Sequence, residues 1–323
     1  MKSIFSHLAL YSVAAALSIY VGTSCCEAPA PTGFSSFDPE TYEERLNFYV
    51  IADSGRNGYY EQKSVAELMG EMAAYVEPEF IAAAGDTHHF MGVESVNDPL
   101  WMTNFELVYS HPELMIPFFP VLGNHEYRGN TQSVIDYTTV SRRWEMPDRY
   151  YTNVVEGEGT SVRMVYVDTP PLIDKYRNDS QKYPDAVEQS MEEQLQWVDS
   201  VLTASTERWR VVVGHHPIYA YTTKNVSERT NMQERLDTIL RRHDVDLYIC
   251  GHIHSFQHLR ATGSNIDYIV NGSASLAREV EPIDETQFCA GIEGFLVVSA
   301  SQKELETTMV DCNGNAIYRF VRE

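Results

Sequence analysis

Short apolar runs alternate with amphipathic stretches along most of the chain. Continuous apolar runs predict buried β-strands at residues 46–52, 80–84, 117–122, 162–167, 210–213 and 247–250. Apolar residues three or four positions apart predict amphipathic helices at 59–75, 188–202 and 231–243. The later runs at 266–271, 294–299, 307–311 and 316–321 predict successive antiparallel strands. This order of strands and helices is typical of an α/β protein.

Almost every predicted strand is followed by residues that commonly bind metal ions in proteins. The first strand ends at Asp53, the second at Gly85-Asp86 and the third at Gly123-Asn124. Because ligands of open α/β sheets bind outside the carboxyl ends of the strands, we expect these side chains to meet at one site. The candidate metal ligands are Asp53, Asp86, His89, Asn124, His215, His252 and His254.

These candidates supply three kinds of donor, namely carboxylate, amide oxygen and imidazole, which suit hard or borderline divalent metals. Two such ions about 3.5–4 Å apart need a bridging carboxylate, and together they stabilise an in-line displacement at phosphorus. Each motif alone has an ordinary structural explanation, since Asp53 and Asn124 suit turns and His215 suits a helix cap or the core. Their ordered occurrence at strand ends is what predicts a metal site.

The composition supports a large globular unit and narrows its partners. The 323 residues are 43% hydrophobic, which is enough to bury the core of a single domain, expected over residues 45–323. The formal net charge of -22 would repel a polyanion, so nucleic acid is not an expected partner. A small phosphorylated substrate remains compatible with this charge, because a pair of divalent cations reverses the local field.

The N-terminus has the features of an export signal. Lys2 provides a positive start, residues 8–22 are mostly apolar, and small residues lead to Cys25. We expect a signal peptide over residues 1–25 and a flexible, proline-containing tether over 26–44. One interpretation is a bacterial lipoprotein, periplasmic or on the cell surface, whose only membrane contact is a lipid on Cys25. Ordinary cleavage would instead give a secreted protein, and an uncleaved anchor is a third alternative.

Three cysteines lie in the expected domain. Cys250 precedes a predicted metal motif and is expected to be a buried thiol. Cys289 and Cys312 could pair in an oxidising compartment, but the sequence does not decide between a disulfide and two thiols.

The metal motifs resemble those of a known family. Their order is similar to that of the calcineurin-like metallophosphoesterases: Asp53, Gly85-Asp86, Gly123-Asn124-His125-Glu126, Gly214-His215-His216-Pro217 and Gly251-His252-Ile253-His254. More narrowly, the chain resembles small purple acid phosphatases of the tartrate-resistant type, over residues 47–322. The resemblance implies an α/β fold of the α+β type, with two face-to-face mixed β-sheets flanked by helices in a four-layer sandwich.

The resemblance also implies roles for individual residues. One metal ion would bind Asp53, Asp86, His254 and a fourth residue, and the other would bind Asp86, Asn124, His215 and His252. Asp86 would bridge the ions, and His125 would contact the phosphate as general acid or transition-state stabiliser. The implied reaction is hydrolysis of a phosphate monoester by in-line attack of a metal-bound hydroxide. A phosphodiesterase or nucleotide hydrolase on the same fold is the alternative, whereas a binding protein with a degenerate metal site is disfavoured because no ligand position is lost.

Two residues depart from the family pattern. Purple acid phosphatases have a tyrosine three residues after the bridging aspartate, and its phenolate stabilises ferric iron and gives the colour; this chain has His89 there. Because a neutral imidazole supplies less charge, we expect two divalent ions of Fe, Zn or Mn and no purple band. His216 stands where the family often has tyrosine, and it is either a catalytic residue or a structural one. Glu126 is a candidate to orient the His125 ring, and His258 is a further candidate for the substrate mouth.

Overall fold

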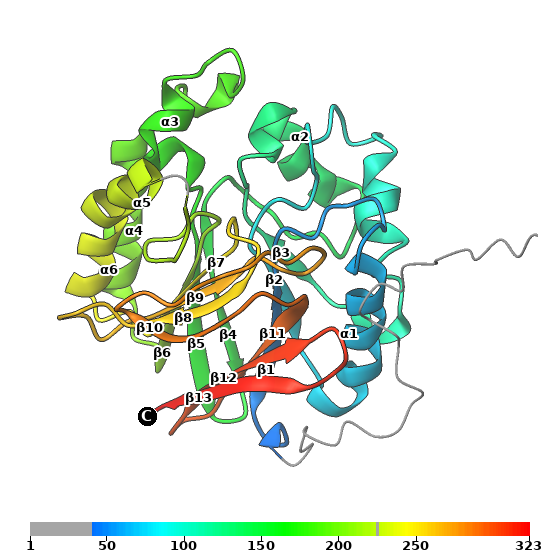
Figure 1. Cartoon of the computed structure of the whole chain (residues 1–323), viewed down its shortest axis with the longest axis vertical. Helices are drawn as coiled ribbons and strands as arrows, with labels where there is room; N and C mark the ends of the chain where they lie inside the picture. Colours follow the sequence, from blue (N-terminus) through cyan, green and yellow to red (C-terminus); the bar gives the residue numbers. More distant parts are fainter. Residues whose placement is uncertain (1–40, 224–225) are drawn as a thin grey trace, which may run out of the picture.

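The structure is a computed structural model that describes residues 41–223 and 226–323. The expected signal peptide at 1–25, with Cys25, and most of the expected tether lie outside the described residues. Within the described ranges, the helices are all too short or too polar to cross a membrane. The strands form two mixed sheets that face each other, and helices cover their outer faces (Figure 1). This arrangement confirms the expected fold class.

One sheet has six strands in the order β13-β12-β11-β1-β2-β3. Strands β1, β2 and β3 are parallel to one another, whereas β11 runs antiparallel to β1 and starts an antiparallel ribbon with β12 and β13. The bounds are β1 Leu46–Ile51, β2 Phe80–Ala83, β3 Phe118–Pro120, β11 Gly294–Ala300, β12 Leu305–Asp311 and β13 Ala316–Arg322.

The other sheet has seven strands in the order β10-β8-β9-β7-β6-β5-β4. Its bounds are β4 Tyr151–Gly157, β5 Thr160–Tyr166, β6 Trp209–Val213, β7 Leu247–Cys250, β8 Phe256–Leu259, β9 Asp267–Asn271 and β10 Thr286–Ala290. Strand β9 pairs in parallel with β7 and in antiparallel with β8. The expectation that it opens a run of successive antiparallel strands is therefore wrong, because β9 belongs to this sheet and β11 to the other.

The central strands of both sheets are buried on both faces. All six residues of β1 and all four of β2 and of β7 are buried, which explains why these strands have continuous apolar runs rather than alternating ones. The parallel sets β1-β2-β3 and β5-β6-β7-β9 each place the carboxyl ends of their strands at one edge of their sheet. That edge carries the loops with the candidate ligands.

The helices form the two outer layers. Helix α1 (Gln62–Val76) lies on the outer side of the sheet that contains β1, and α4 (Met191–Ala204), α5 (Val226–Met232) and α6 (Thr238–Arg242) lie on the outer side of the other sheet (Figure 1). Helix α1 begins at Gln62 rather than at 59, because Gly58 and Tyr60 have positive φ values of 75° and 54° that interrupt a helix. The helix expected over 231–243 is divided, since a π-helical turn, η8 (Gln233–Asp237), separates α5 from α6. The short helices α2 (Thr131–Asp136) and α3 (Asp174–Arg177) lie above the strand ends (Figure 1).

The cysteines behave differently from one another. Cys250 is a buried free thiol, as expected, and its Sγ donates to the carbonyl of Ile269 at 3.4 Å. Cys289 is half-buried and free, whereas Cys312 is disulfide-bonded. Cys289 and Cys312 therefore do not pair with each other.

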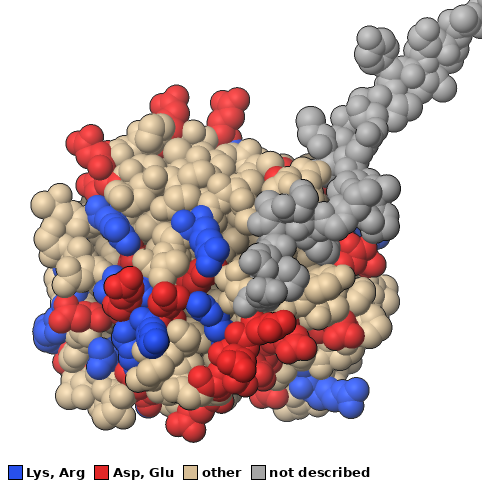
Figure 2. Space-filling view, turned by 90° about the horizontal axis from the view of Figure 1, so that it is seen from below, with Lys and Arg blue, Asp and Glu red and all other residues tan. Residues whose placement is uncertain are grey.

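The surface carries charges of both signs despite the net charge of -22. The face seen in Figure 2 has basic side chains interspersed with acidic ones. Some of these charges are paired, as in the 2.9 Å contact between Arg45 and Glu304. The acidity of the chain is thus distributed, and it does not prevent local regions from being positive.

Candidate metal centre

The loops that follow β1, β2, β6 and β7 converge and bring together residues that are far apart in the sequence. Donor atoms within 4.8 Å of one another form four overlapping groups: Asp53-His89-His254, Asp86-His89-His125, Asp53-Asp86-His215 and His215-His216-His252. Asn124, in the loop after β3, is also buried, at 4% exposure. Because the groups share members, they form one cluster.

Asp86 lies at the centre of this cluster. Its Oδ2 atom is 3.3 Å from Nε2 of His215, 3.5 Å from Nε2 of His89 and 3.7 Å from Nε2 of His125. Its Oδ1 atom accepts a 2.9 Å hydrogen bond from the backbone N–H of His125, which fixes the carboxylate. A carboxylate held among three imidazoles has the position that a bridging ligand needs.

Asp53 occupies the neighbouring part of the cluster. Its Oδ1 atom is 3.3 Å from Nε2 of His254, and its Oδ2 atom accepts a 2.7 Å hydrogen bond from the backbone N–H of His252. His89 faces the same region, and its Nδ1 is 3.0 Å from the carbonyl oxygen of Gly55. Since a carbonyl only accepts, Nδ1 carries the proton and Nε2 presents its lone pair to the cluster.

Several donor atoms of the cluster are buried without a hydrogen-bond partner among the described residues: Asp53 Oδ1, His89 Nε2, Asn124 Oδ1 and His215 Nε2. A buried polar atom left unsatisfied costs about 1–3 kcal/mol, so a concentration of them requires a partner of another kind. Two donor atoms bound at about 2.1 Å to one tetrahedral ion lie about 3.4 Å apart, close to the separations observed here. The residues therefore fit divalent metal ions.

The backbone of the cluster is unusual in two ways. Asp53, Asp86 and His252 have positive φ values of 54°, 53° and 68°. Residues other than glycine rarely adopt this region of backbone conformation. A Cβ atom on Gly123 would lie 2.2 Å from Oδ1 of Asp86, and one on Gly251 would lie 2.4 Å from Oδ2 of Asp53. Strained ligands and close glycines concentrate at functional sites, where the surrounding structure holds them in place.

The two carboxylates are charged at neutral pH. Burial alone would raise the pKa of Asp86, but His215 and His125 beside it hold that pKa well below its usual range. Burial would likewise raise the pKa of Asp53, and His254 more than offsets it, so this pKa is also lowered. Burial would lower the pKa of His215, whereas Asp86 raises it to about 10. Without a metal ion, the proton on His215 thus partly balances the negative charge of Asp53 and Asp86. A bound cation would neutralise the same charge.

Comparison with known proteins agrees with this geometry. Residues 46–256 match the family described as calcineurin-like phosphoesterase. Purple acid phosphatase 3 of Arabidopsis thaliana is 30% identical over 299 residues, which cover 87% of this chain and 79% of the relative. Human tartrate-resistant acid phosphatase type 5 is 28% identical, with 85% of this chain and 90% of the relative covered.

This chain belongs to the calcineurin-like phosphoesterase family. Members of that family depend on a pair of metal ions, in agreement with the clustered donors. Among solved structures, GAP50, described as the anchor in the inner membrane complex of Plasmodium, has a TM-score of 0.74 at 23% identity and covers 85% of this chain and 88% of its own. Purple acid phosphatase PPD1 from yellow lupin seeds has a TM-score of 0.64 at 13% identity, covering 86% of this chain and 53% of its own.

In this phosphoesterase, His252 contacts a residue that the sequence did not single out. Its Nε2 is 3.0 Å from Oε2 of Glu228, which lies in α5 and is 1% exposed. Because the carboxylate accepts, Nε2 carries the proton, and a metal ion would bind through Nδ1. Glu228 also accepts from Nζ of Lys175 at 2.7 Å and from the hydroxyl of Tyr176 at 2.8 Å. No local motif marks Glu228, since it lies in an ordinary helical segment 24 residues before His252.

His125 lies at the edge of the cluster, and its side chain is 14% exposed. Its Nδ1 is 2.8 Å from the carbonyl oxygen of Phe90, so Nε2 faces Asp86. Glu126 does not orient this ring. Its carboxylate accepts instead from the backbone N–H groups of Asp86, His88 and Gly123 at 2.8–3.0 Å, which ties the loops after β2 and β3 together.

His216 is fully buried, and both of its ring nitrogens have partners. Nδ1 is 2.8 Å from the hydroxyl of Thr169, and Nε2 is 2.8 Å from the hydroxyl of Tyr176. Burial holds the pKa of His216 well below its usual value, so the ring is neutral. With no nitrogen left to meet a substrate, the geometry favours the structural alternative for His216.

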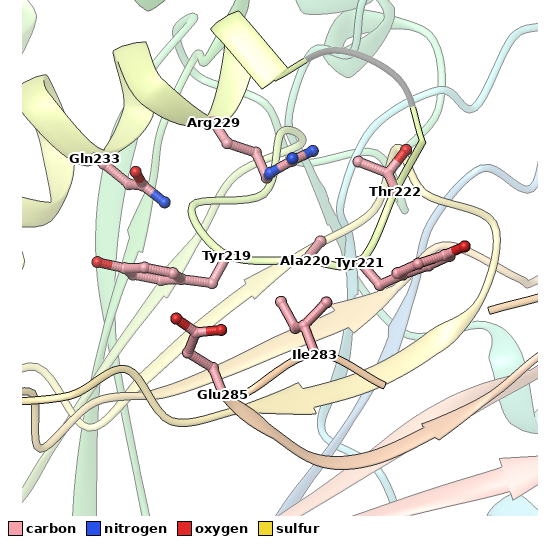
Figure 3. Close-up of a pocket in the computed structure, with 8 residues that line it drawn as sticks. All are labelled: Tyr219, Ala220, Tyr221, Thr222, Arg229, Gln233, Ile283 and Glu285. Atoms are coloured by element: carbon pink, nitrogen blue, oxygen red, sulfur yellow. The ribbon is translucent and has the colours of Figure 1, made fainter. Parts of the chain in front are cut away.

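Two further features lie away from the cluster. His258 is in β8 and is 1% exposed, and its contacts are Asp267 and Tyr318, so it does not line a substrate mouth. A cleft of about 480 Å³ opens beside the loop that follows His216 (Figure 3). Its lining contains none of the candidate metal ligands: Tyr219, Ala220, Tyr221, Thr222, Arg229, Gln233, Ile283 and Glu285.

Proposed function

We propose that the chain hydrolyses phosphate monoesters with two divalent metal ions held at the carboxyl ends of the strands. The observation that carries the proposal is the set of buried donor atoms with no hydrogen-bond partner in the described ranges, gathered around Asp86. The relationship to purple acid phosphatases supports the choice of phosphate esters. Every ligand position of the family pattern carries a donor residue in this chain, with His89 in place of the tyrosine, which favours hydrolysis over a purely structural use of the fold.

The donor set divides into two halves that share Asp86. The proposed ligands of one ion are Asp53, Asp86, His89 and His254, and those of the other are Asp86, Asn124, His215 and His252. Gly55 and Ala84 each accept from Nδ1 of a histidine, His89 and His215 respectively, and so direct the Nε2 atoms inward. Glu228 accepts from Nε2 of His252 and so directs the other ring nitrogen, Nδ1, inward.

When bound, the two ions would supply an activated water molecule and a positive field for the phosphoryl oxygens. His125 would supply the proton for the leaving oxygen. The Phe90 carbonyl accepts from Nδ1 of His125, so Nε2 faces Asp86 and is the ring atom through which a proton would pass to a substrate. Burial of Asp53 and His215 excludes bulk water from the half of the cluster behind the substrate.

A metal assay combined with a substrate panel tests the proposal. The purified protein should contain about two divalent ions per chain by mass spectrometry. It should hydrolyse an aryl phosphate faster than an aryl phosphodiester with the same phenol leaving group, and faster than a nucleotide. A faster reaction with the diester would instead indicate that the same metal centre acts as a phosphodiesterase. Absence of turnover with all substrates in a metal-loaded protein would leave a non-catalytic use of the fold.

His89 defines the metal that the centre should prefer. A tyrosine phenolate is absent from this position, so the iron-loaded protein should lack a phenolate charge-transfer band in the visible spectrum. The variant His89→Tyr should gain that band when it is loaded with iron under oxidising conditions. His89→Phe is the matched control, because it has an aromatic ring but no donor atom. A visible band in the unchanged protein would contradict the assignment of His89.

A further inference from the structure

Arg56 is a buried arginine near the metal centre whose guanidinium forms no ion pair with the residues that the structure describes. It lies three residues after Asp53 and is 7% exposed. Its Nε atom is buried without a partner, and its guanidinium makes no hydrogen bond or ion pair with the residues that the structure describes. Arginines that are this deeply buried are normally paired, because an unpaired buried charge is costly.

The surroundings of Arg56 place it at the mouth of the centre. The preceding residue, Gly55, is held by its N–H to the carbonyl of Asp86 at 3.2 Å and by its carbonyl to His89. The guanidinium carbon lies 5.4 Å from the ring centroid of Phe90. That ring is 66% exposed and lies 6.2 Å, centroid to centroid, from the ring of His125. The guanidinium of Arg56 thus lies against Phe90, whose ring in turn neighbours the proposed proton donor His125.

The charge of Arg56 is difficult to explain by the protein alone. Asp53 and Asp86 attract the guanidinium electrostatically, but neither forms a direct ion pair with it. Once two divalent ions neutralise those carboxylates, the guanidinium is left beside an excess of positive charge. Such an arrangement is unfavourable until an anion enters, and it then favours the anion strongly.

The chemistry of Arg56 indicates which anion fits. A guanidinium presents parallel N–H groups that match two oxygens of a phosphate, and it stacks on aromatic rings while doing so. A phosphate monoester bound to two metal ions through two of its oxygens still has a third charged oxygen. A diester has only two non-bridging oxygens, and so it has none left for this contact.

We propose that Arg56, supported by Phe90, binds the third phosphoryl oxygen and thereby selects phosphate monoesters over diesters. This inference rests on the proposed function and deepens it. The competing explanation is that Arg56 only balances the charges of Asp53 and Asp86. The two explanations predict different changes in phosphate binding and in metal binding. Removal of an anion-binding arginine weakens phosphate binding and leaves metal binding unchanged or tighter, whereas removal of a balancing charge alters metal binding or folding and leaves phosphate binding unchanged.

The experiment measures binding of inorganic phosphate to zinc-loaded protein by calorimetry, together with zinc affinity. Arg56→Met should raise the Kd for phosphate about 10- to 100-fold, as expected for loss of a charged hydrogen-bonding pair. Arg56→Lys keeps the charge but loses the paired N–H groups, so its Kd should be intermediate. Arg45→Met is the matched control, because Arg45 is partly buried and paired with Glu304 away from the centre. It should bind phosphate as the unchanged protein does.

The outcomes are separable. A phosphate Kd within twofold of the unchanged protein in both Arg56 variants overturns the inference, as does a loss of zinc in Arg56→Met. Should Arg56→Met not fold, an unaltered Kd in Arg56→Lys overturns it by itself. Arg56-dependent phosphate binding in a protein that hydrolyses no ester would leave the inference standing and defeat the proposed function. Monoester hydrolysis with Arg56-independent phosphate binding would do the reverse.

Discussion

Two clusters of buried polar residues in this molecule have opposite character. The first is the candidate metal centre around Asp86, where donor atoms face one another at 3.3–3.7 Å without forming hydrogen bonds. The second surrounds Asp267 at the start of β9, which is also fully buried. Asp267 accepts from Nε2 of His258 at 2.8 Å and from Arg322 at 3.1 Å, and Arg260 also donates to it.

The difference separates a structural cluster from a functional one. Both clusters contain histidine and carboxylate, so composition alone does not distinguish them. The Asp267 carboxylate is satisfied by the protein, and its role ends with joining β8, β9 and β13. Several donor atoms around Asp86 lack such partners among the described residues, and bound cations would satisfy them. A concentration of unsatisfied metal-binding atoms in one place, rather than the presence of histidine, therefore distinguishes the candidate metal centre.

The largest expected effect is at Asp86. Asp86→Asn removes the shared negative charge, so the protein should lose metal and phosphatase activity together, with activity falling to background. Metal content by mass spectrometry and turnover of an aryl phosphate measure the two losses. Asp267→Asn is the control from the other cluster and should retain both ions. Activity of the Asp86 variant with full metal content would contradict the bridging assignment.

The next effect is at His125. His125→Ala removes the proposed proton donor but none of the proposed ligands, so kcat should fall about 10²- to 10⁴-fold while metal content stays unchanged. The loss should be smaller for an aryl phosphate with an acidic phenol, which needs no protonation to leave. An equal loss for good and poor leaving groups would assign His125 to phosphate binding alone.

The Asp267 cluster should affect stability instead. Asp267→Asn removes the negative charge and one of the two oxygens that accept from His258 and Arg322, and it should lower the free energy of unfolding by about 3–5 kcal/mol, measured by urea denaturation. Burial would raise the pKa of Asp267, but His258 and Arg260 hold it below its usual value. Its contribution is therefore present above the unfolded pKa of about 3.9 and is lost as pH falls below that value. The variant should accordingly lose less stability than the unchanged protein on acidification.

The smallest effect concerns Glu228. Glu228→Gln weakens the support of His252, so metal affinity should fall about 10- to 100-fold at one of the two sites. Competition with a chelator, read as stepwise metal release, measures this change. The exposed Glu281, which accepts from the hydroxyl of Tyr221 at 3.3 Å, offers the control Glu281→Gln. Equal affinity in the Glu228 variant would show that His252 needs no carboxylate partner.

The sequence predicts the elements that are buried on both faces. Strands β1, β2, β6 and β7 appear as continuous apolar runs, and the residues that follow them are the donors that the structure brings together. Strand β4 has no continuous apolar run, because the polar residues Asn153 and Glu156 interrupt it, and the sequence therefore does not predict it. Strand β8 was missed because Gln257 and His258 are polar, although both are buried through hydrogen bonds with other segments.

The sequence is less informative where a contact joins distant segments. Glu228 contacts His252 from helix α5. The sequence pattern of that helix does not distinguish Glu228 from glutamates that lie on the surface. Arg56 belongs to the loop that carries Asp53, so its place near the centre could have been expected from the chain. That it is buried and lacks an anion depends on the packing of Phe90, and this only the structure reveals.

The left-handed backbone of three candidate ligands has a consequence for how such a chain can change over time. At Asp53, Asp86 and His252 the conformation costs an ordinary side chain about 1–2 kcal/mol, a cost that glycine does not bear. Replacement by glycine would therefore tend to relax the backbone while removing a donor. Backbone stability alone would favour glycine at these positions, so the donor atoms of aspartate and histidine account for the residues found there. In a related protein that no longer needs metal ions, we therefore expect Asp53, Asp86 and His252 to be replaced before the other ligands, because glycine at these positions relieves backbone strain.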